Sequence, residues 1–393
     1  MATLVTEALE TVRNDHVESH LHTTPTFDLA AHPTPSGREE IWRFTPLRRL
    51  GSLLDDVAPG GRIELQADVP AGVAWSTVTA DEAAALGGIA PLDRLGALAA
   101  LHAPQVGVLD IPADTELTEL IRVRAIGAGT ADAVAEHTVI RVGRHASARL
   151  LLENSGSAHY NEFVQVIVED GARVDLVTIN DWADDAVHTG QTNILVGRDA
   201  EVRHFEVTIG GDVVRTSTNV AYSGTGGAFE GFGLYFADAG QHIEHRLFVD
   251  HNQPKTSSNV VYKGALQGER AHTVWIGNIL IRKVAEGIET YEENRNLILS
   301  DGAQADSVPN LEIETGEIAG AGHASATARF DDEQLFYLRS RGISEKEAQR
   351  LVVHGFFDDL IRRIGIAEVE DKLRVTVEAE LAKNVLREPG PGA

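Results

Sequence analysis

Hydrophobic residues over positions 105–325 follow the two-residue alternation of β-strands, without the three- and four-residue spacing of helices. Short runs rich in Val, Ile and Leu, such as EFVQVIVEDG (162–171), end at Gly or Asp. A glycine-led phrase recurs at nearly constant spacing, at Gly143, Gly171 and Gly197. A repeat of this length that holds two or three strands predicts a stacked β-solenoid. A β-sandwich is the structural alternative, although the NG and DG pairs that favour hairpins are sparse.

The apolar spacing becomes helical after residue 330. Asp331 or Asp332 can cap a first helix that ends at Gly342, and the SEKE stretch at 344–347 is a capping box for a second. The apolar face expected for this second helix comprises Ala348, Leu351, Val352, Phe356, Leu360, Ile361 and Ile364. A third helix is expected over 367–386. These patterns predict a C-terminal helical domain over residues 326–388 and a frayed tail over 389–393.

The N-terminal part has a different character from the repeats. Residues 1–36 are rich in His, Thr and Pro, and we expect a mobile arm. Residues 37–104 form a region of mixed and helical pattern. Within it, the aromatic segment 38–50 is expected to dock on the body, and a single Ala-rich helix is expected over 80–101.

Composition narrows the function. The 393 residues carry a net charge of −25, which argues against nucleic acid or an anionic membrane as the main partner. Since the chain contains no cysteine, disulfides, thiol nucleophiles and self-contained cysteine-ligated clusters are excluded. The start, MATLVTEALE, has no basic segment before an apolar core, and no uninterrupted apolar run is long enough for a membrane-spanning helix. We therefore expect no signal peptide and a cytoplasmic location.

Few residues stand out as chemistry-bearing, since no P-loop, GxGxxG, GxSxG or HExxH motif is present. The stretch QHIEHRLFVDH gathers His242, His245, Asp250 and His251, but a metal site would need several of them to converge. Their ordinary interpretation is that they lie on the surface or satisfy hydrogen bonds at turns. His323, in GHASAT, follows small residues that leave it accessible. A structural role is the ordinary interpretation for it as well, because a lone imidazole needs other donors from another chain to hold a metal.

Four segments resemble the SufB/SufD family of iron–sulfur cluster assembly proteins. They are EIWRFTPL (40–47), DHNQPKTSSNVVYKGAL (250–266), ENRNLILSDGAQADSVPNLEI (293–313) and, after GHASAT, RFDDEQLFYLRSRGISEKEAQRLVVHGFF (329–357). The resemblance extends over most of the chain. It implies a right-handed parallel β-helix flanked by helical N- and C-terminal regions.

Two alanines and the absence of cysteine indicate which type of family member the chain resembles, and a third alanine departs from some relatives of that type. Ala303 stands where the SufB type carries its cluster-assembly cysteine, and Ala324 stands where that type has a glutamate after the histidine. Ala321 stands where some SufD relatives carry a cysteine, so no role for that thiol can be carried over. The histidine itself is kept as His323. The chain therefore resembles the SufD type.

The resemblance implies a non-catalytic scaffold subunit of the SufBCD complex. It would pair with a SufB-type subunit through the β-helix and with a SufC ATPase through the C-terminal helices, and sulfur would arrive from a cysteine desulfurase chiefly through SufB. Because imidazole is an accepted ligand in iron–sulfur chemistry, we expect His323 to bind a transient cluster shared with SufB. We expect no cofactor stably bound by this chain alone. The residues expected to contact the ATPase are Phe336, Tyr337, Arg339, Arg341 and Gly342.

Two alternatives stay open at this point. The chain could be a purely structural partner that offers no ligand, or a β-helix carbohydrate-active enzyme, which its lack of a secretory signal and of clustered carboxylates disfavours. For Phe336, packing in the helical core is the alternative to an ATPase contact. The sequence leaves open the cluster type, the stoichiometry, whether reduced flavin contacts this chain, and whether unpaired β-helix edges permit a homodimer when the chain is alone.

Overall fold

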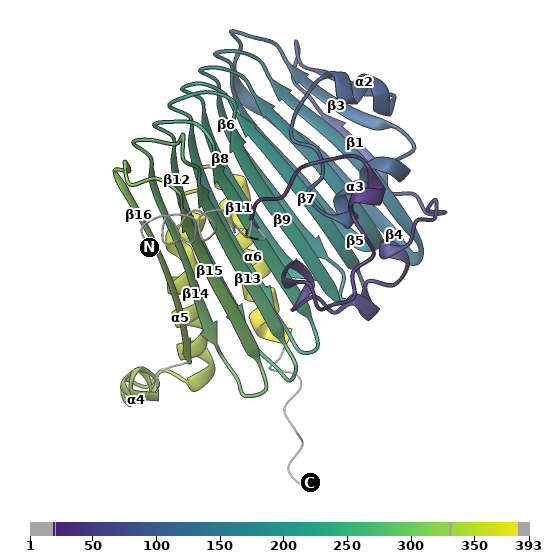
Figure 1. Ribbon diagram of the computed structural model, residues 1–393. Helices are drawn as coiled ribbons and strands as arrows, with labels where there is room; N and C mark the ends of the chain where they lie inside the picture. The colour runs from purple at the N-terminus through teal and green to yellow at the C-terminus, as the bar shows by residue number, and fades with distance from the viewer. Residues whose placement is uncertain (1–18, 20, 330–331, 384–393) are drawn as a thin grey trace, which may run out of the picture.

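A β-solenoid of sixteen strands makes up most of the computed structural model, which describes residues 19, 21–329 and 332–383 (Figure 1). The strands that form one of its layers are β6 (Arg173–Trp182), β8 (Glu201–Gly210), β10 (Ala228–Ala237), β12 (Ser257–Leu266), β14 (Glu289–Ile298) and β16 (Gly320–Arg329). Those that form the opposite layer are β7 (Val187–Val196), β9 (Val213–Tyr222), β11 (His242–His251), β13 (His272–Ile281) and β15 (Gln304–Ile313). The long strands β4 (Glu116–Val142) and β5 (Ser147–Val168) belong to both layers, because the first part of β5 pairs with β6 and the second with β7.

Parallel pairing between successive coils confirms the solenoid and rules out the sandwich. Ser147 lies opposite Arg173 of the following coil, and near the other end His272 lies opposite Gln304 in the same way. The predicted glycine repeat marks the corners of the coils for two reasons. Gly171 has a φ of +68°, which favours glycine, and at Gly197 a Cβ would lie 2.6 Å from the backbone of Glu169.

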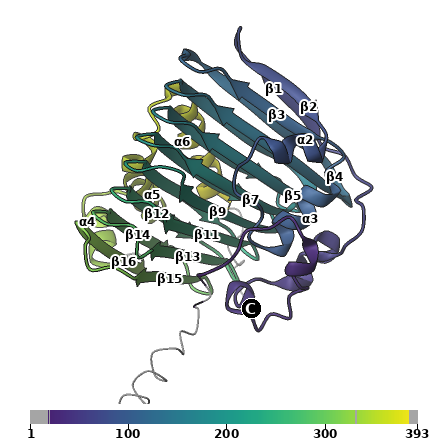
Figure 2. The ribbon, with the colours of Figure 1, turned by 45° about the horizontal axis from the view of Figure 1, so that its top comes forward.

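The interior between the two layers holds the main core. Apolar residues from alternate strand positions stack there coil on coil, including Leu150, Val166, Leu247 and Trp275. At the start of the chain, β1 (Glu64–Asp68) and β2 (Ala74–Val78) add antiparallel pairs, and β3 (Val106–Ile111) adds a parallel one. Figure 2 shows these strands at one end of the solenoid and β15 and β16 at the other.

Short helices lie in the part of the chain before β3. They are η1 (Leu29–Ala31), η2 (Glu40–Trp42), η3 (Leu47–Arg49), η4 (Gly51–Leu54), α2 (Ala80–Ala85) and α3 (Arg94–His102). The prediction of one helix over 80–101 is wrong, because Gly87 and Gly88 adopt φ values of +84° and +100° and break it. A capping box at Thr79 starts α2, and Asp93 caps α3.

The described part of the expected N-terminal arm lies against the body. The Thr26 amide donates to the Pro91 carbonyl at 2.9 Å, and the Arg94 guanidinium donates to the His32 carbonyl at 2.9 Å. Leu21 is buried. Residues 1–18 and 20 of that arm, and 384–393 at the other end, lie outside the described residues, and the domain limits expected from the sequence stay predictions.

Three helices close the chain: α4 (Asp332–Ser340), α5 (Glu345–Ile361) and α6 (Ala367–Lys383). As predicted, Gly342 follows α4 with a φ of +85°, and the Ser344 hydroxyl accepts the Glu347 amide at the start of α5. Asp331, one of the two expected caps, lies outside the described residues. None of the described helices is both long and apolar enough to span a lipid bilayer.

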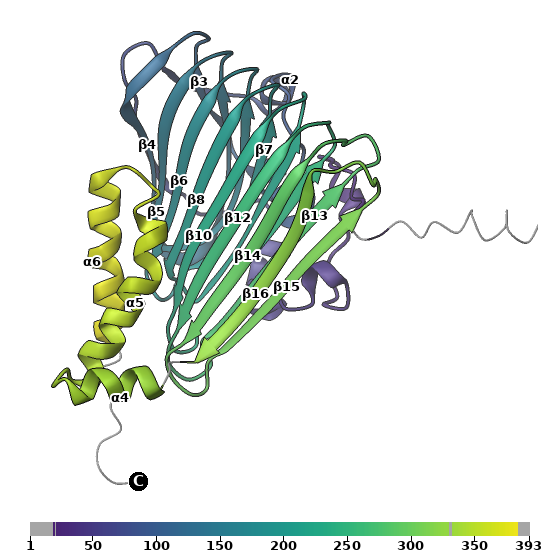
Figure 3. The same ribbon diagram turned by 90° about the vertical axis from the view of Figure 1, so that its left-hand side faces the viewer.

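Helices α5 and α6 cover the outer face of the layer that contains β8 and β10 (Figure 3). Their buried contacts include Val353 and Phe357 against Phe232 and Leu234 of the sheet. The predicted apolar face of α5 is wrong at Leu351, which is 46% exposed, because the helix turns Val353 and Phe357 to the sheet instead.

Candidate functional site

The last coil leaves the end of the solenoid open. In the described part of the chain, β16 pairs with β14 and β15 pairs with β13, and neither has a partner on its other edge. The two strands lie beside one another at this end (Figure 3). Unpaired backbone donors and acceptors are therefore presented on both layers, a surface that can add strands from another chain.

His323 lies near the start of β16 and is exposed. It is in register with Glu292 of β14, so the two side chains leave neighbouring strands on the same face of the sheet. Buried and exposed residues alternate around Glu292, which places that face toward the interior between the layers. His323 thus faces the mouth of the solenoid, where its imidazole can meet a ligand or a second chain.

Glu292 is fully buried, and neither of its carboxyl oxygens has a hydrogen-bond partner. Its carboxyl group lies over Gly277 of the opposite layer, where a Cβ would lie 2.2 Å from Oε2 and 2.4 Å from the ring of Trp275. The missing side chain at Gly277 therefore makes the room that Glu292 fills. Burial raises the pKa of Glu292 to about 8.

Polar side chains continue around this end of the interior. The Ser307 hydroxyl donates to Asn294 Oδ1 at 2.6 Å, and Asn294 Nδ2 donates to the Tyr235 hydroxyl at 2.8 Å. Asn296 Nδ2 donates to the Ser307 hydroxyl at 3.0 Å. These groups satisfy one another across the two layers, which leaves the Glu292 carboxyl beside a satisfied network rather than within it.

Ala303, Ala321 and Ala324, on which the resemblance to the SufD type was judged, bring no ligand atom to this end. Ala303 packs against the main core before β15, and Ala321 packs beside the apolar cluster that includes Ile279. Ala324 is in register with Glu293, on the face opposite to His323.

The polar residues of β11 are distributed over both faces of the strand. His242 is buried, with Nδ1 3.2 Å from Nδ1 of His272 and Nε2 3.4 Å from Glu244. Burial is the main cause that lowers the pKa of His242. His245 faces the interior, where its Nδ1 lies 3.2 Å from Glu206. As the alternation predicted, Glu244 accompanies His242 while His245 lies opposite.

The far end of β11 carries the other two candidates. Asp250 pairs with Arg282 through two contacts of 2.7 and 2.8 Å. Both ring nitrogens of His251 contact hydroxyls, those of Thr256 at 2.8 Å and Ser258 at 3.0 Å. The length of the extended strand separates His242 from His251 by roughly 30 Å, so the structure does not bring the four candidates together around one ion.

The pH dependence of stability should report the burial of His251, because burial lowers its pKa to about 4. An unfolded histidine takes up a proton near pH 6.5. Stability is therefore fully present above that pH and falls as the pH is lowered toward 4, by about 3 kcal/mol for this residue. We expect the free energy of unfolding of His251→Asn, measured in urea from pH 7 to 4, to fall less with decreasing pH than that of the wild type.

His145→Asn is the matched control, because His145 is exposed at a corner with a φ of 56° that asparagine tolerates. It should keep the wild-type pH dependence. If the free energy of unfolding depends on pH equally in His251→Asn and in the wild type, the fold does not hold this histidine neutral.

An exposed aromatic patch lies on α4. Phe336 is 76% exposed and Tyr337 is 56% exposed, and the guanidinium of Arg341 lies 5.1 Å from the centre of the Tyr337 ring. Arg339 is also exposed, and Gly342 ends the helix. Phe336 is thus surface rather than bundle core, which leaves its ring available to a partner.

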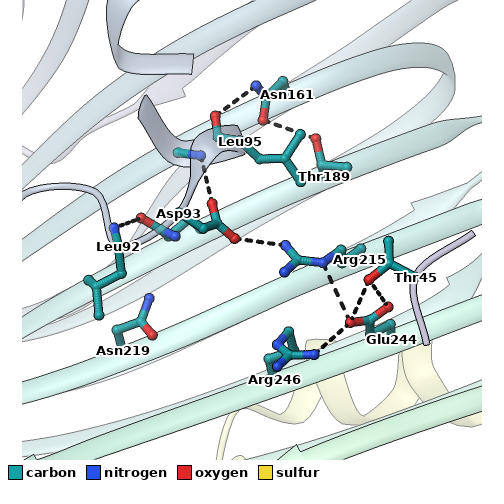
Figure 4. A network of polar contacts seen from close by, with 12 residues as sticks. Thr45, Leu92, Asp93, Leu95, Asn161, Thr189, Arg215, Asn219, Glu244 and Arg246 are labelled. Atoms are coloured by element: carbon teal, nitrogen blue, oxygen red, sulfur yellow. Dashed lines mark hydrogen bonds and ion pairs between the residues drawn. The ribbon is translucent and has the colours of Figure 1, made fainter. Parts of the chain in front are cut away.

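A buried ionic network joins the N-terminal segment to the solenoid (Figure 4). Arg215 contacts Asp93 at 3.0 Å and Glu244 at 3.5 Å, and its guanidinium lies 4.3 Å from the centre of a Trp42 ring. Glu244 also accepts hydrogen bonds from Arg246 at 3.0 Å and from the Thr45 hydroxyl at 2.9 Å. Burial opposes ionisation of Glu244, but His242 and the two arginines hold its pKa well below its usual range. These contacts confirm that segment 38–50 docks on the body.

Among the described residues, one group of three side chains meets the spacing of a metal site. His22 Nε2 lies 3.0 Å from Glu312 and 3.4 Å from Glu314, at the end of β15. No sequence pattern pointed to this cluster, because His22 and Glu312 come from opposite ends of the chain. No sequence pattern pointed to Glu292 or Arg215 either, because their roles depend on strand register.

Comparison with known proteins identifies the relatives of the chain. The family model described as "SUF system FeS cluster assembly, SufBD core domain" matches residues 125–356. An iron–sulfur cluster assembly SufBD family protein of Mycobacterium leprae is 49% identical over 363 residues, which cover 90% of this chain and 92% of that protein. One from Mycobacterium tuberculosis H37Rv is 48% identical over 362 residues, with 90% and 91% covered. A second Mycobacterium leprae protein of the same description is 28% identical over 210 residues, 53% of this chain and 24% of its own length.

Proposed function

Because this chain belongs to the SufBD family of iron–sulfur cluster assembly proteins, we propose that it is a non-catalytic subunit of a cluster-assembly complex. Its role there is to offer His323 to a cluster that forms where its last coil meets a SufB-type subunit. The observation that carries this proposal is the exposed imidazole of His323 at the open end of the solenoid.

The chemistry of the chain makes this role asymmetric. A chain without cysteine can supply a nitrogen ligand but cannot carry persulfide, so sulfur and thiolate must come from the partner. The cluster is cargo that is built and passed on. A cysteine desulfurase would deliver the sulfur to the partner rather than to this chain.

The edges of β15 and β16 are suited to pairing with a different member of the family. Backbone groups on both edges can pair with the corresponding strands of a related solenoid. Mycobacterium leprae has two different relatives of this chain, at 49% and 28% identity, which supports pairing between unlike members. A homodimer through the same edges is the competing assembly, and the mass of the purified complex separates the two.

The patch on α4 is proposed to bind the ATPase subunit. Exposed aromatic rings beside arginines are the residue types that contribute most to protein interfaces. Phe336, Tyr337, Arg339 and Arg341 provide these types on and just after one short helix, with Gly342 setting its end.

Substitution of both aromatic residues tests this contact. We expect Phe336→Ala with Tyr337→Ala to weaken binding of the purified SufC ATPase at least about tenfold, because both rings are lost from the interface. Folding should be unaffected, since both side chains are exposed. Affinity is measured by surface-based binding kinetics.

Val375→Ala, at an exposed site on α6, is the control and should bind as the wild type does. Undiminished binding by the double variant would refute the assignment. Truncation after residue 330 would be a poorer test, because it would uncover Phe205, Phe232 and Leu234 on the solenoid.

A further inference from the structure

Glu292 differs from the other buried acidic residues in the described part of the chain. Asp93 and Glu244 contact Arg215, Glu206 contacts His245, and Asp238 accepts the Ala239 amide. Glu380 also has an interaction partner. The carboxyl group of Glu292 alone among them has neither a hydrogen bond nor an ion pair.

A carboxyl group in such a place is costly to the fold. Burial without a hydrogen bond or counter-charge removes its hydration and gives nothing in return. Leucine or methionine would fill the space over Gly277 without that cost. The chain instead places an oxygen donor one strand away from the exposed imidazole of His323.

We propose that Glu292 is a second ligand from this chain to the iron that His323 binds at the open end of the solenoid. This inference rests on the proposed function of His323. Ferrous iron accepts imidazole nitrogen together with carboxylate oxygen, and a divalent cation supplies the counter-charge that Glu292 lacks. Thiolates of the partner subunit would complete the coordination.

The placement of the two residues allows this. Neighbouring strands lie about 4.8 Å apart, so side chains in register on one face can reach a single ion between them. Glu292 lies in the strand directly below the final one, and no further strand covers β16 in the described part of the chain. Iron delivered at the mouth therefore has one layer of side chains to pass before it meets the carboxylate.

Cobalt binding to the full-length chain tests the proposal without cluster assembly. Co²⁺ reports imidazole and carboxylate ligands through its visible absorption, and the signal that His323→Ala removes defines the site. We expect Glu292→Gln to weaken this His323-dependent binding about tenfold, since the amide keeps the shape of the side chain but loses its charge. Glu289→Gln, an exposed position of the same strand, should bind Co²⁺ as the wild type does.

The outcomes separate this inference from the proposed function. If His323→Ala lowers cluster yield in the complex but Glu292→Gln binds Co²⁺ like Glu289→Gln, Glu292 is a buried structural acid and the inference is overturned. If His323→Ala leaves cluster yield unchanged, the proposed function fails first. The unfolding temperature of Glu292→Gln serves as the check on its folding. It should not fall below that of the wild type, because a neutral amide replaces an uncompensated acid.

Discussion

His323→Ala is expected to lower the cluster yield of the purified complex at least about tenfold, because loss of a ligand costs at least as much as loss of the groups that support one. The complex itself should form normally, since the His323 side chain is exposed rather than packed in the core. The measurement is iron and acid-labile sulfide per complex after assembly, together with the mass of the complex.

Ser325→Ala is the matched control for this variant. Ser325 follows His323 on the same face of β16 and is also exposed, and removal of its hydroxyl takes no imidazole from the mouth. It should leave the yield unchanged. An intact complex with undiminished yield for His323→Ala would reduce the chain to a structural partner that offers no ligand.

Arg215→Ala is expected to destabilise the protein by about 3–5 kcal/mol, because it leaves the buried carboxylates of Asp93 and Glu244 without one of their counter-charges. The substitution also removes the guanidinium from the face of the Trp42 ring, a contact that holds the N-terminal segment against the solenoid. Chemical denaturation at neutral pH measures the change in the free energy of unfolding.

A second arginine serves as the control for this prediction. Arg49 contacts Asp212 at 2.7 Å, but both side chains are more than one-third exposed. Arg49→Ala should therefore cost less than about 1 kcal/mol. A similarly small effect for Arg215→Ala would mean that the buried network does not fasten the N-terminal segment.

The repeat architecture could be predicted from the sequence because its signals are local. Strand alternation and corner glycines are set by neighbouring residues, so Gly171 and Gly197 mark corners in the structure as the pattern indicated. The prediction of one helix over 80–101 was wrong because the alanines in this stretch counted for more than Gly87 and Gly88, which adopt left-handed conformations. The predicted apolar face of α5 was wrong in part because Val353 and Phe357 are the residues that pack on the sheet.

The candidate site divides in the same way. His323 was found through the motif that surrounds it, and the structure places it at the exposed last coil. Glu292 was missed because its position follows from the register between β14 and β16, a full coil apart in the chain, and from the space above Gly277 in the opposite layer. The β11 histidines looked like a cluster in sequence, yet strand geometry sends His242 and His245 to opposite faces.

Nitrogen coordination from this subunit is the central claim, and pulsed electron paramagnetic resonance tests it most directly. The complex is assembled with ¹⁵N-histidine in this chain only, loaded with cluster and reduced to a paramagnetic state. A ¹⁵N coupling to the cluster that disappears in His323→Ala is the predicted result. A cluster-loaded wild-type complex without any ¹⁵N coupling would contradict the account.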